Sequence, residues 1–566
     1  MSASGNRSSY DNILTHIGGL GLYQRRILLL AVVACAGKSI HILSTIFTMG
    51  AQDFRCAISG LPNDTFHIRD EAHMRMLNAS IPFDSSEEAY SQCHRFQTEE
   101  EAGSAGMLNS TSRDLVTCTK WVYSTDIFVT SIISQLDLVC DHHIYTTHAN
   151  MMTMTGMMIG SLVSGVISDR FGRKKTFLFF FWLHLSITVA MAFVRSVPLF
   201  LVLRLITASS SVAFFMTACI LCMEMVSPKK RTLAGMMAMF GWSLGMFTLV
   251  LAAFLVRDWQ TLQLVLSCPM VIVGVSYIWL MPESPRWLLS KGRYSEARAI
   301  LQTMSKVNKR EIPEKMLMSE VCTEAREDQT EEYQPPAKGE NMWRLLKSPV
   351  LVIRLIILAY GWLINSMVYY GLTLNVGSII EGDIYLNFLV MSVLELIAYV
   401  CLVLSLAGTL GRKPVFCVCV LLGGLACLST ILPIVLEVDA SWINMVLSNL
   451  GKFFITSSFA LVWIYTPEVL PTQLRQSGLG VCSFTGRVGG MISPYIASLN
   501  TVIAGPMGRV LPLLIFGLAA ICSGMFSLFL PETSRRKLPE TLEEAKSMKW
   551  RKQGRQPDGS LDSQPC

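Results

Sequence analysis

The sequence has few charged residues and lacks the short motifs of most enzyme classes. Only 16% of its 566 residues are Asp, Glu, Lys or Arg, and the formal net charge is +6. There is no Walker loop, so ATP-driven pumping is not expected. Neither a metal-ligand cluster nor a nucleophile elbow is present, so we expect no enzyme, cofactor or metal site. A basic stripe with interleaved aromatic residues is also missing, which argues against a nucleic-acid partner.

The N-terminal segment lacks the apolar core and small-residue cleavage site of a secretory signal peptide. Residues 1–26 are polar instead, and a long apolar run begins at about Ile27. We therefore expect a cytoplasmic N-terminus, followed by a first span that serves as its own membrane-insertion signal.

Apolar residues are abundant and occur in long runs. They make up 51% of the chain, and the mean hydropathy is +0.44. A bilayer core of about 30 Å needs about 20 apolar residues in a helix. The sequence predicts twelve such spans, at about 27–49, 148–168, 176–194, 198–223, 232–255, 261–281, 350–373, 384–406, 414–434, 441–465, 477–499 and 508–530.

Basic residues cluster on one side of this twelve-span arrangement. The short loops on the opposite side carry few, such as Arg195 and Arg257. The positive-inside rule then places both termini in the cytoplasm and the long loop of residues 50–147 outside. The basic clusters lie in residues 24–26, 169–175, 228–231, 411–413 and 534–537.

The loop of residues 50–147 carries the marks of an oxidising, glycosylated compartment. It holds four of the sixteen cysteines and three Asn-x-Ser/Thr acceptors. Four cysteines allow three pairings, and the sequence does not choose among them. The cysteines are Cys56, Cys93, Cys118 and Cys140, and the acceptors are Asn63, Asn78 and Asn109.

Three landmarks recur along the chain at nearly one spacing. Gly172-Arg-Lys recurs at Gly411, Glu224 at Glu468, and Pro282-Glu at Pro531-Glu, at separations of 239, 244 and 249 residues. Such a repeat indicates duplication, and two six-helix halves in lipid form the major facilitator architecture. We expect an all-α membrane protein whose parts are residues 1–26, a half at 27–281, a cytoplasmic linker at 282–349, a half at 350–530 and a cytoplasmic tail at 531–566.

Several stretches resemble the major facilitator superfamily, and within it solute carrier family 22. The resemblance runs from about residue 11 to 545, and the second half is closest to the fly-like and carnitine-type branches. Sugar porters share the stretch after residue 281, but they lack so large an outer loop. The stretches are Gly165-x-x-x-Asp-Arg-Phe-Gly-Arg-Lys174, Pro282-Glu-Ser-Pro-Arg-Trp-Leu288, Tyr369-Tyr-Gly-Leu-Thr-Leu374, Gly382-Asp-Ile-Tyr-Leu-Asn387, Tyr465-Thr-Pro-Glu468 and Arg475-Gln-Ser-Gly-Leu-Gly480.

Three ionisable side chains are predicted at mid-membrane depth, where each charge costs a few kcal/mol. They are Lys38, Glu395 and Arg487. The alternatives are a structural ion pair, such as Glu395 with Arg487, and a charged substrate site. The resemblance implies arginine at position 487 in anion and zwitterion carriers, and an acid at position 395 in cation and carnitine carriers. Lys38 departs from the carnitine pattern, which leaves an anionic substrate open.

Aromatic residues form a second group of substrate-binding candidates. Trp362 and Tyr369 are seven residues apart and therefore share a helix face. Together with Phe215 they match positions that line the pocket of organic cation transporters. Ring faces attract ammonium groups by about 0.5–2 kcal/mol. Packing within the helix bundle is the alternative role.

A third group of residues lies at the predicted cytoplasmic helix ends. They resemble the inner charge network of the family, which implies a gating role, and a structural role is the alternative. His184 is a lone histidine in an apolar run, more simply packed than protonated. The charged residues are Asp169, Arg170, Arg173, Glu224, Arg231, Glu468 and Arg475.

These features predict a multi-pass plasma-membrane carrier that moves small organic zwitterions or cations, carnitine-like or betaine-like, by alternating access. Its expected partners are that substrate, the lipid bilayer and a coupling ion, sodium or proton, which the sequence does not choose. An organic anion carrier of the same family is the alternative. A non-transporting receptor that uses the outer loop is a more distant one.

Overall fold

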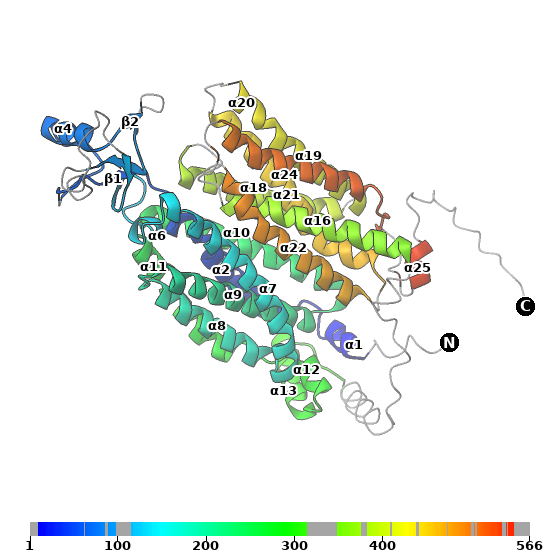
Figure 1. Cartoon of the computed structure of the whole chain (residues 1–566). Coiled ribbons are helices and arrows are strands. Elements are labelled where there is room, and N and C mark those ends of the chain that lie inside the picture. Colours follow the sequence, from blue (N-terminus) through cyan, green and yellow to red (C-terminus); the bar gives the residue numbers. More distant parts are fainter. Residues whose placement is uncertain are drawn as a thin grey trace, which may run out of the picture. The chain divides into compact units, whose positions relative to one another are not determined.

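The fold was analysed in a computed structural model of the 566-residue chain (Figure 1). The elements of the part that the structure describes are helices, apart from short strands between Phe54 and Tyr123. The all-α prediction is therefore confirmed. The structure describes residues 9–61, 63–84, 89–97, 115–313, 348–374, 382–407, 410–436, 441–471, 474–499, 503, 506–534, 539 and 542–547.

The chain forms two compact units, which divide inside the predicted linker. Among the described residues, the first contains those up to 313 and 382–389, and the second contains the remainder. The segment 382–389 therefore packs with the first unit, although the sequence analysis assigned it to the second half. The contact is aromatic. The ring centre of Phe47 lies 5.3 Å from that of Phe388 and 5.5 Å from that of Tyr385.

Each predicted span coincides with a long helix (Figure 1). The first unit contains α2 (Leu22–Leu43), α7 (Ile144–Phe171), α8 (Arg173–Met191), α9 (Val197–Met225), α10 (Arg231–Leu255) and α11 (Trp259–Leu280). The following helices come next along the chain: α16 (Pro349–Leu374), α18 (Ile384–Ala407), α19 (Arg412–Ser429), α21 (Ser441–Val469), α22 (Arg475–Ala497) and α24 (Pro506–Ser527).

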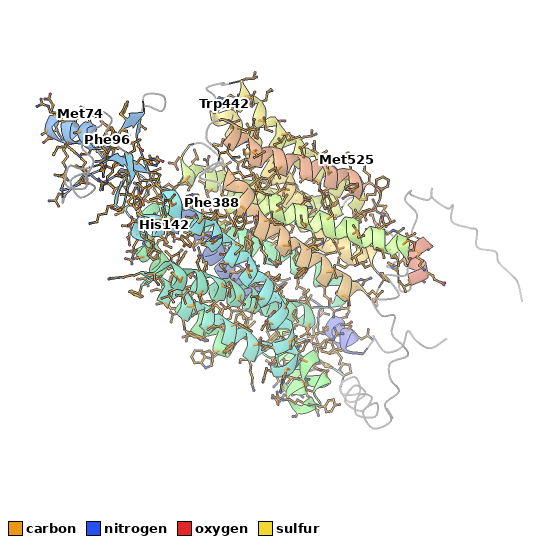
Figure 2. The ribbon with its side chains drawn as sticks, viewed as in Figure 1. Met74, Phe96, His142, Phe388, Trp442 and Met525 are labelled. Atoms are coloured by element: carbon orange, nitrogen blue, oxygen red, sulfur yellow. A yellow bond between two sulfur atoms is a disulfide. The ribbon has the colours of Figure 1, made fainter. Side chains whose placement is uncertain are left out.

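Ten helices of the described part are long and apolar enough to cross a membrane. The two others are α8, which begins with Arg173-Lys-Lys, and α22, which carries Arg487 among small and polar residues. Large apolar side chains are exposed along the membrane helices, as Figure 2 shows for Trp442 of α21 (68% exposed) and Met525 of α24 (47%). Water would disfavour such surfaces, whereas a bilayer solvates them.

Shorter helices surround the spans. Near the N-terminus and the long outer loop they are α1 (Ser9–His16), α3 (Thr45–Thr48), α4 (Glu71–Ser80), α6 (Ile132–Gln135) and the turn η1 (Cys140–His142). The remaining ones are the turn η2 (Pro228–Lys230), α12 (Pro285–Ser290), α13 (Tyr294–Asn308), α20 (Ile431–Val435) and α25 (Leu542–Ser547).

The outer loop forms a small domain of α4 and three two-stranded antiparallel sheets. Two disulfides join it, Cys56–Cys118 and Cys93–Cys140, which selects one of the three pairings that the sequence left open. Asn63 and Asn78 are exposed, and Asn109 lies outside the described residues. The sheets pair β1 (Phe54–Cys56) with β6 (Trp121–Tyr123), β2 (Phe83–Asp84) with β3 (Ala89–Tyr90), and β4 (His94–Phe96) with β5 (Leu115–Thr117).

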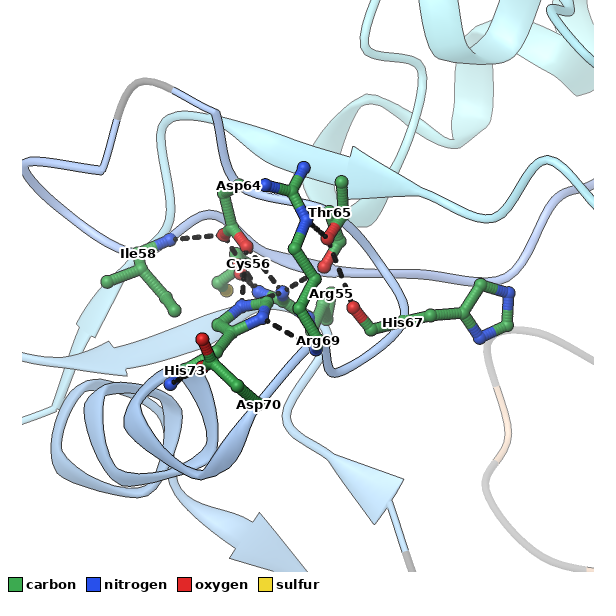
Figure 3. Close-up of polar contacts among 9 residues, drawn as sticks. All are labelled: Arg55, Cys56, Ile58, Asp64, Thr65, His67, Arg69, Asp70 and His73. Atoms are coloured by element: carbon green, nitrogen blue, oxygen red, sulfur yellow. Dashed lines mark hydrogen bonds and ion pairs between the residues drawn. The ribbon is translucent and has the colours of Figure 1, made fainter.

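A buried ion pair holds this domain together (Figure 3). Asp64 accepts hydrogen bonds from both terminal nitrogens of Arg55, at 2.6 and 3.0 Å, and from the Ile58 N–H at 2.9 Å. Nε2 of His73 lies 3.0 Å from the same carboxylate. Burial alone would raise the pKa of Asp64, but these hydrogen bonds and the charge of Arg55 lower it below its ordinary value.

The N-terminal segment docks on the first unit. Asp11 of α1 forms a 2.6 Å ion pair with Arg231 at the start of α10, and the Tyr10 hydroxyl donates to the Glu224 carbonyl. Asn308, the last residue of α13, donates to the carbonyl of Ile17 and accepts from the N–H of Tyr23. The described residues that precede α2, 9–21, are therefore docked on the first unit.

Candidate functional site

A cluster of fully buried polar groups lies inside the second unit. Glu395 of α18 is completely buried, and its Oε1 accepts 2.8 Å hydrogen bonds from the hydroxyls of Tyr369 and Tyr399. Lys452 of α21 is also buried, and its Nζ lies 3.7 Å from Oε2 of Glu395. The same Nζ lies 3.1 Å from the centre of the Tyr369 ring and donates to Thr373.

Glu395 therefore has Lys452 as a cationic partner, and the sequence analysis did not select this lysine. The signal was nevertheless available. Lys452 stands near the middle of the predicted span 441–465, so the rule that selected Glu395 by depth selects it too. Arg487 of α22 lies beside the hydroxyl of Tyr370, with which it interacts electrostatically and by a hydrogen bond.

Aromatic side chains border this cluster. Trp362, one of the predicted pocket residues, donates its indole N–H to Thr466 at 2.8 Å and contacts Trp463 with ring centres 4.4 Å apart. Phe459 lies 6.2 Å from Trp362 and 5.4 Å from Tyr369, so it links the two predicted aromatic residues. Trp362, Tyr369 and Glu395 thus belong to one buried neighbourhood.

The other two predicted substrate residues meet inside the first unit. Nζ of Lys38, on α2, lies 4.0 Å above the Phe215 ring of α9 and 5.4 Å from the Trp242 ring of α10. All three side chains are buried. An ammonium over two rings gains cation–π energy of about 2 kcal/mol when it is desolvated.

The predicted charge network is built around Arg173 in the first unit. Its guanidinium binds both carboxylate oxygens of Glu224, at 3.0 and 3.1 Å, and lies 2.9 Å from Asp169. Glu283 accepts from the backbone N–H groups of Arg173 and Lys174, at 2.7 and 3.1 Å, so it caps the start of α8.

The second unit repeats this arrangement in a looser form. Arg412 lies 3.4 Å from Glu468, and Glu532 accepts from the Arg412 N–H at 2.9 Å. Thr533 donates to Glu468 at 2.6 Å. The three landmarks of the sequence repeat therefore converge, because Arg173, Glu224 and Glu283 correspond to Arg412, Glu468 and Glu532.

The remaining residues of the predicted network have other places. Arg170 is exposed, and its guanidinium lies 5.5 Å from the ring of its neighbour Phe171. Arg231 pairs with Asp11, and Arg475 begins α22. The sequence analysis missed Glu283, Arg412 and Glu532 as network members, although all three lie within the repeated motifs that it had found.

The chain is similar to known membrane transporters over most of its length. Residues 88–545 match the family "Sugar (and other) transporter". An organic cation transporter protein of Drosophila melanogaster is 32% identical over 95% of this chain and 94% of its own. Organic cation/carnitine transporter 2 of Rattus norvegicus is 28% identical over 96% and 95%.

A solved structure supports the fold, although its sequence identity to this chain is low. The D-xylose-proton symporter has a TM-score of 0.56 at 14% identity, and the match covers 91% of this chain and all of that one. The chain therefore belongs to the sugar (and other) transporter family of the major facilitator superfamily, on the solute carrier family 22 branch that contains the organic cation and carnitine transporters.

Proposed function

We propose that this membrane transporter carries small organic cations and zwitterions, and that Glu395 recognises their ammonium group. The observation that supports this best is the position of Lys452. Its Nζ lies between the Glu395 carboxylate and the Tyr369 ring, so the second unit already holds an ammonium against an acid and an aromatic face. These are the two kinds of group that recognise organic ammonium ions.

In this proposal the substrate competes with Lys452 for Glu395. A transported ammonium that took over the carboxylate and the Tyr369 ring would release Lys452, whose charge then needs another partner. A substrate that also carries a carboxylate supplies one, which favours carnitine-like and betaine-like zwitterions over simple cations. Arg487 of α22, in the same unit, is a further cationic group for such a carboxylate.

An organic anion is the second candidate, because buried cations outnumber buried acids among the residues that the structure describes. Lys38, Arg204 and Lys452 are all less than 9% exposed, whereas Glu395 is the acid buried among the same spans. An excess of positive charge in a low-dielectric interior attracts anions. The candidate groups for its carboxylate are Lys38 of the first unit and Arg487 of the second.

The charge networks at Arg173 and Arg412 are proposed to act in gating. They join the ends of consecutive spans through ion pairs and helix caps, which conformational change can make and break. The protein is proposed to lie in the plasma membrane with both termini in the cytoplasm, on the basis of its basic loops and the disulfide-linked outer domain.

The deciding experiment is uptake of three labelled probes by cells that express the full chain: a quaternary cation, a carnitine-like zwitterion and an aromatic carboxylate. The Glu395→Gln variant is expected to lose at least about tenfold in uptake of the cation and the zwitterion, the effect of one charged hydrogen bond of about 1.5–3 kcal/mol. Glu296→Gln, an exposed glutamate of α13, is the matched control. Uptake of the carboxylate alone, unaffected by Glu395→Gln, would establish the anion alternative and reject the role of Glu395.

A further inference from the structure

Besides Lys38, the membrane helices of the first unit contain another buried cation, Arg204. Arg204 is in α9 and is 3% exposed. Its guanidinium stays protonated at any physiological pH, yet Nε and Nη2 make no hydrogen bond within the described structure. The centre of the Phe200 ring lies 5.7 Å from the guanidinium carbon and stabilises the charge in part by a cation–π contact.

Two buried histidines contact each other on α2 and α8, the helices that pack against α9. His41 of α2 and His184 of α8 are 1% and 2% exposed, and their rings meet edge to face with centres 4.8 Å apart. Arg204 is close enough for its charge to act on His41. Both ring nitrogens of His41 lack a hydrogen-bond partner in the described structure.

The hydrogen bonding of His184 fixes its tautomer. Nδ1 lies 3.2 Å from the carbonyl oxygen of Thr207, which can only accept, so the proton is on Nδ1. Nε2 of His184 and the hydroxyl of Thr207 have no partner among the described residues. The three helices α2, α8 and α9 therefore each carry buried side-chain atoms that have no hydrogen-bond partner among the described residues.

The membrane helices of the first unit offer Arg204 no carboxylate. The sequences of α2, α8, α10 and α11 contain neither Asp nor Glu. The acids of α7 and α9 stand near the cytoplasmic network, and both Asp169 and Glu224 pair with Arg173. Glu224 is twenty positions beyond Arg204 on the same helix, which corresponds to about 30 Å.

We propose that Arg204, His41 and Thr207 bind a small anion, either chloride or the carboxylate of a small molecule. An anion would accept from Nε and Nη2 of Arg204, from one N–H of His41 and from the Thr207 hydroxyl. It would also neutralise the guanidinium, which a neutral water molecule cannot do. A buried unpaired charge is one of the costliest features of a protein interior, so the anion stabilises the first unit.

The test is the melting midpoint of the purified full-length protein in lipid nanodiscs. Chloride is titrated against gluconate at constant ionic strength, and formate is titrated in a parallel series. A ligand that binds the folded state raises the midpoint in a saturable manner. We expect such a rise with chloride, with formate or with both, and the series that responds identifies the chemistry of the bound anion.

Two variants locate the response. Arg204→Met is expected to melt at the same temperature in all three salts, whereas Arg195→Met, an exposed arginine nine residues earlier, keeps the wild-type response. His41→Leu is expected to weaken the apparent anion constant about tenfold, and it provides an answer if Arg204→Met does not fold. A wild-type midpoint that is equal in all salts, a response that survives Arg204→Met, or an unchanged constant in His41→Leu would each overturn the site. None of these measurements depends on transport, so the outcome is separate from that of the proposed substrate.

Discussion

The membrane helices of the two units hold a buried cation in different ways. In the second unit Lys452 has the carboxylate of Glu395 at 3.7 Å and the ring of Tyr369 beneath it. In the first unit Arg204 has the Phe200 ring at 5.7 Å, and the neighbouring helices α2 and α8 contain neither Asp nor Glu. The duplicated halves therefore share their helices and the charge networks at the helix ends. Inside the two units, however, buried cations are stabilised by different groups.

Breaking the Lys452–Glu395 pair is expected to have the largest effect. Lys452→Met leaves Glu395 buried without a cation and should cost about 3–5 kcal/mol of unfolding free energy. Lys452→Met combined with Glu395→Gln should recover most of this loss, because no charge is then left unpaired. Melting midpoints of the two variants check this, with Lys306→Met on the surface of α13 as the control. If the double variant is no more stable than Lys452→Met, the lost stability does not come from the unpaired charge of Glu395.

The outer domain, apart from the membrane helices, also contains a buried cation with a carboxylate partner, Arg55 with Asp64. Asp64→Asn leaves Arg55 without its carboxylate and should cost about 3 kcal/mol at neutral pH, at the lower end for a buried pair. Because the folded pKa of Asp64 is depressed, its contribution is fully present above the ordinary carboxyl value of 3.8 and is lost as the pH falls through the folded value.

Proteolysis of the outer domain across pH measures this contribution. The wild type should lose protection at acidic pH below about 4, and Asp64→Asn should lack this component of the pH dependence. Asp53→Asn, an exposed carboxylate close by in the sequence, is the control. An identical acid profile for Asp64→Asn and the wild type would contradict the role of Asp64.

The two end networks differ in tightness, so matched substitutions should differ in cost. Arg173 binds both oxygens of Glu224, whereas Arg412 approaches Glu468 at 3.4 Å. We expect Arg173→Gln to cost about 1.5–3 kcal/mol, the range for charged hydrogen bonds, and Arg412→Gln less than about 1 kcal/mol. Equal shifts in the melting midpoint would show that the two networks are energetically equivalent despite their geometry.

The smallest expected difference is between two equivalent glycines. Gly172 has φ +99°, and a Cβ there would lie 2.5 Å from Glu283 Oε2. Gly411 has φ −74°, and a Cβ there would likewise meet Glu532 Oε2. Both alanine variants disturb a glutamate, but only Gly172→Ala adds backbone strain of about 1–3 kcal/mol. Its midpoint should therefore fall further than that of Gly411→Ala, and the reverse order would contradict this account.

Much of the fold could be predicted from the sequence because hydropathy alone sets the position of a span. The positions of the twelve long helices, the duplication and the outer domain followed from the length and spacing of apolar runs. The disulfide pairing could not, since it depends on how β1 meets β6 and how residues 93 and 140 approach. Docking of α1 was also unpredictable, because Asp11 and Arg231 are 220 residues apart and neither has a distinctive local pattern.

The candidate site was predicted in part. Depth within a span selected Glu395, and helical spacing placed Trp362 and Tyr369 on one face, as the structure shows. The position of Glu395 along its span does not show which cation lies beside it, because that depends on how α18 and α21 pack. The roles of Arg204 and His41 were hidden for the same reason, since a missing partner is visible only when the neighbours are known.

The contact between Asp11 and Arg231 has a consequence for the synthesis of the chain. Asp11 leaves the ribosome 220 residues before its partner, which corresponds to about 11–44 s at about 5–20 residues per second. During that interval the N-terminal segment has no docking place on α10, while the first four spans are already being made. The segment is therefore held only after the fifth span begins, so its docking reports how far assembly of the first unit has advanced.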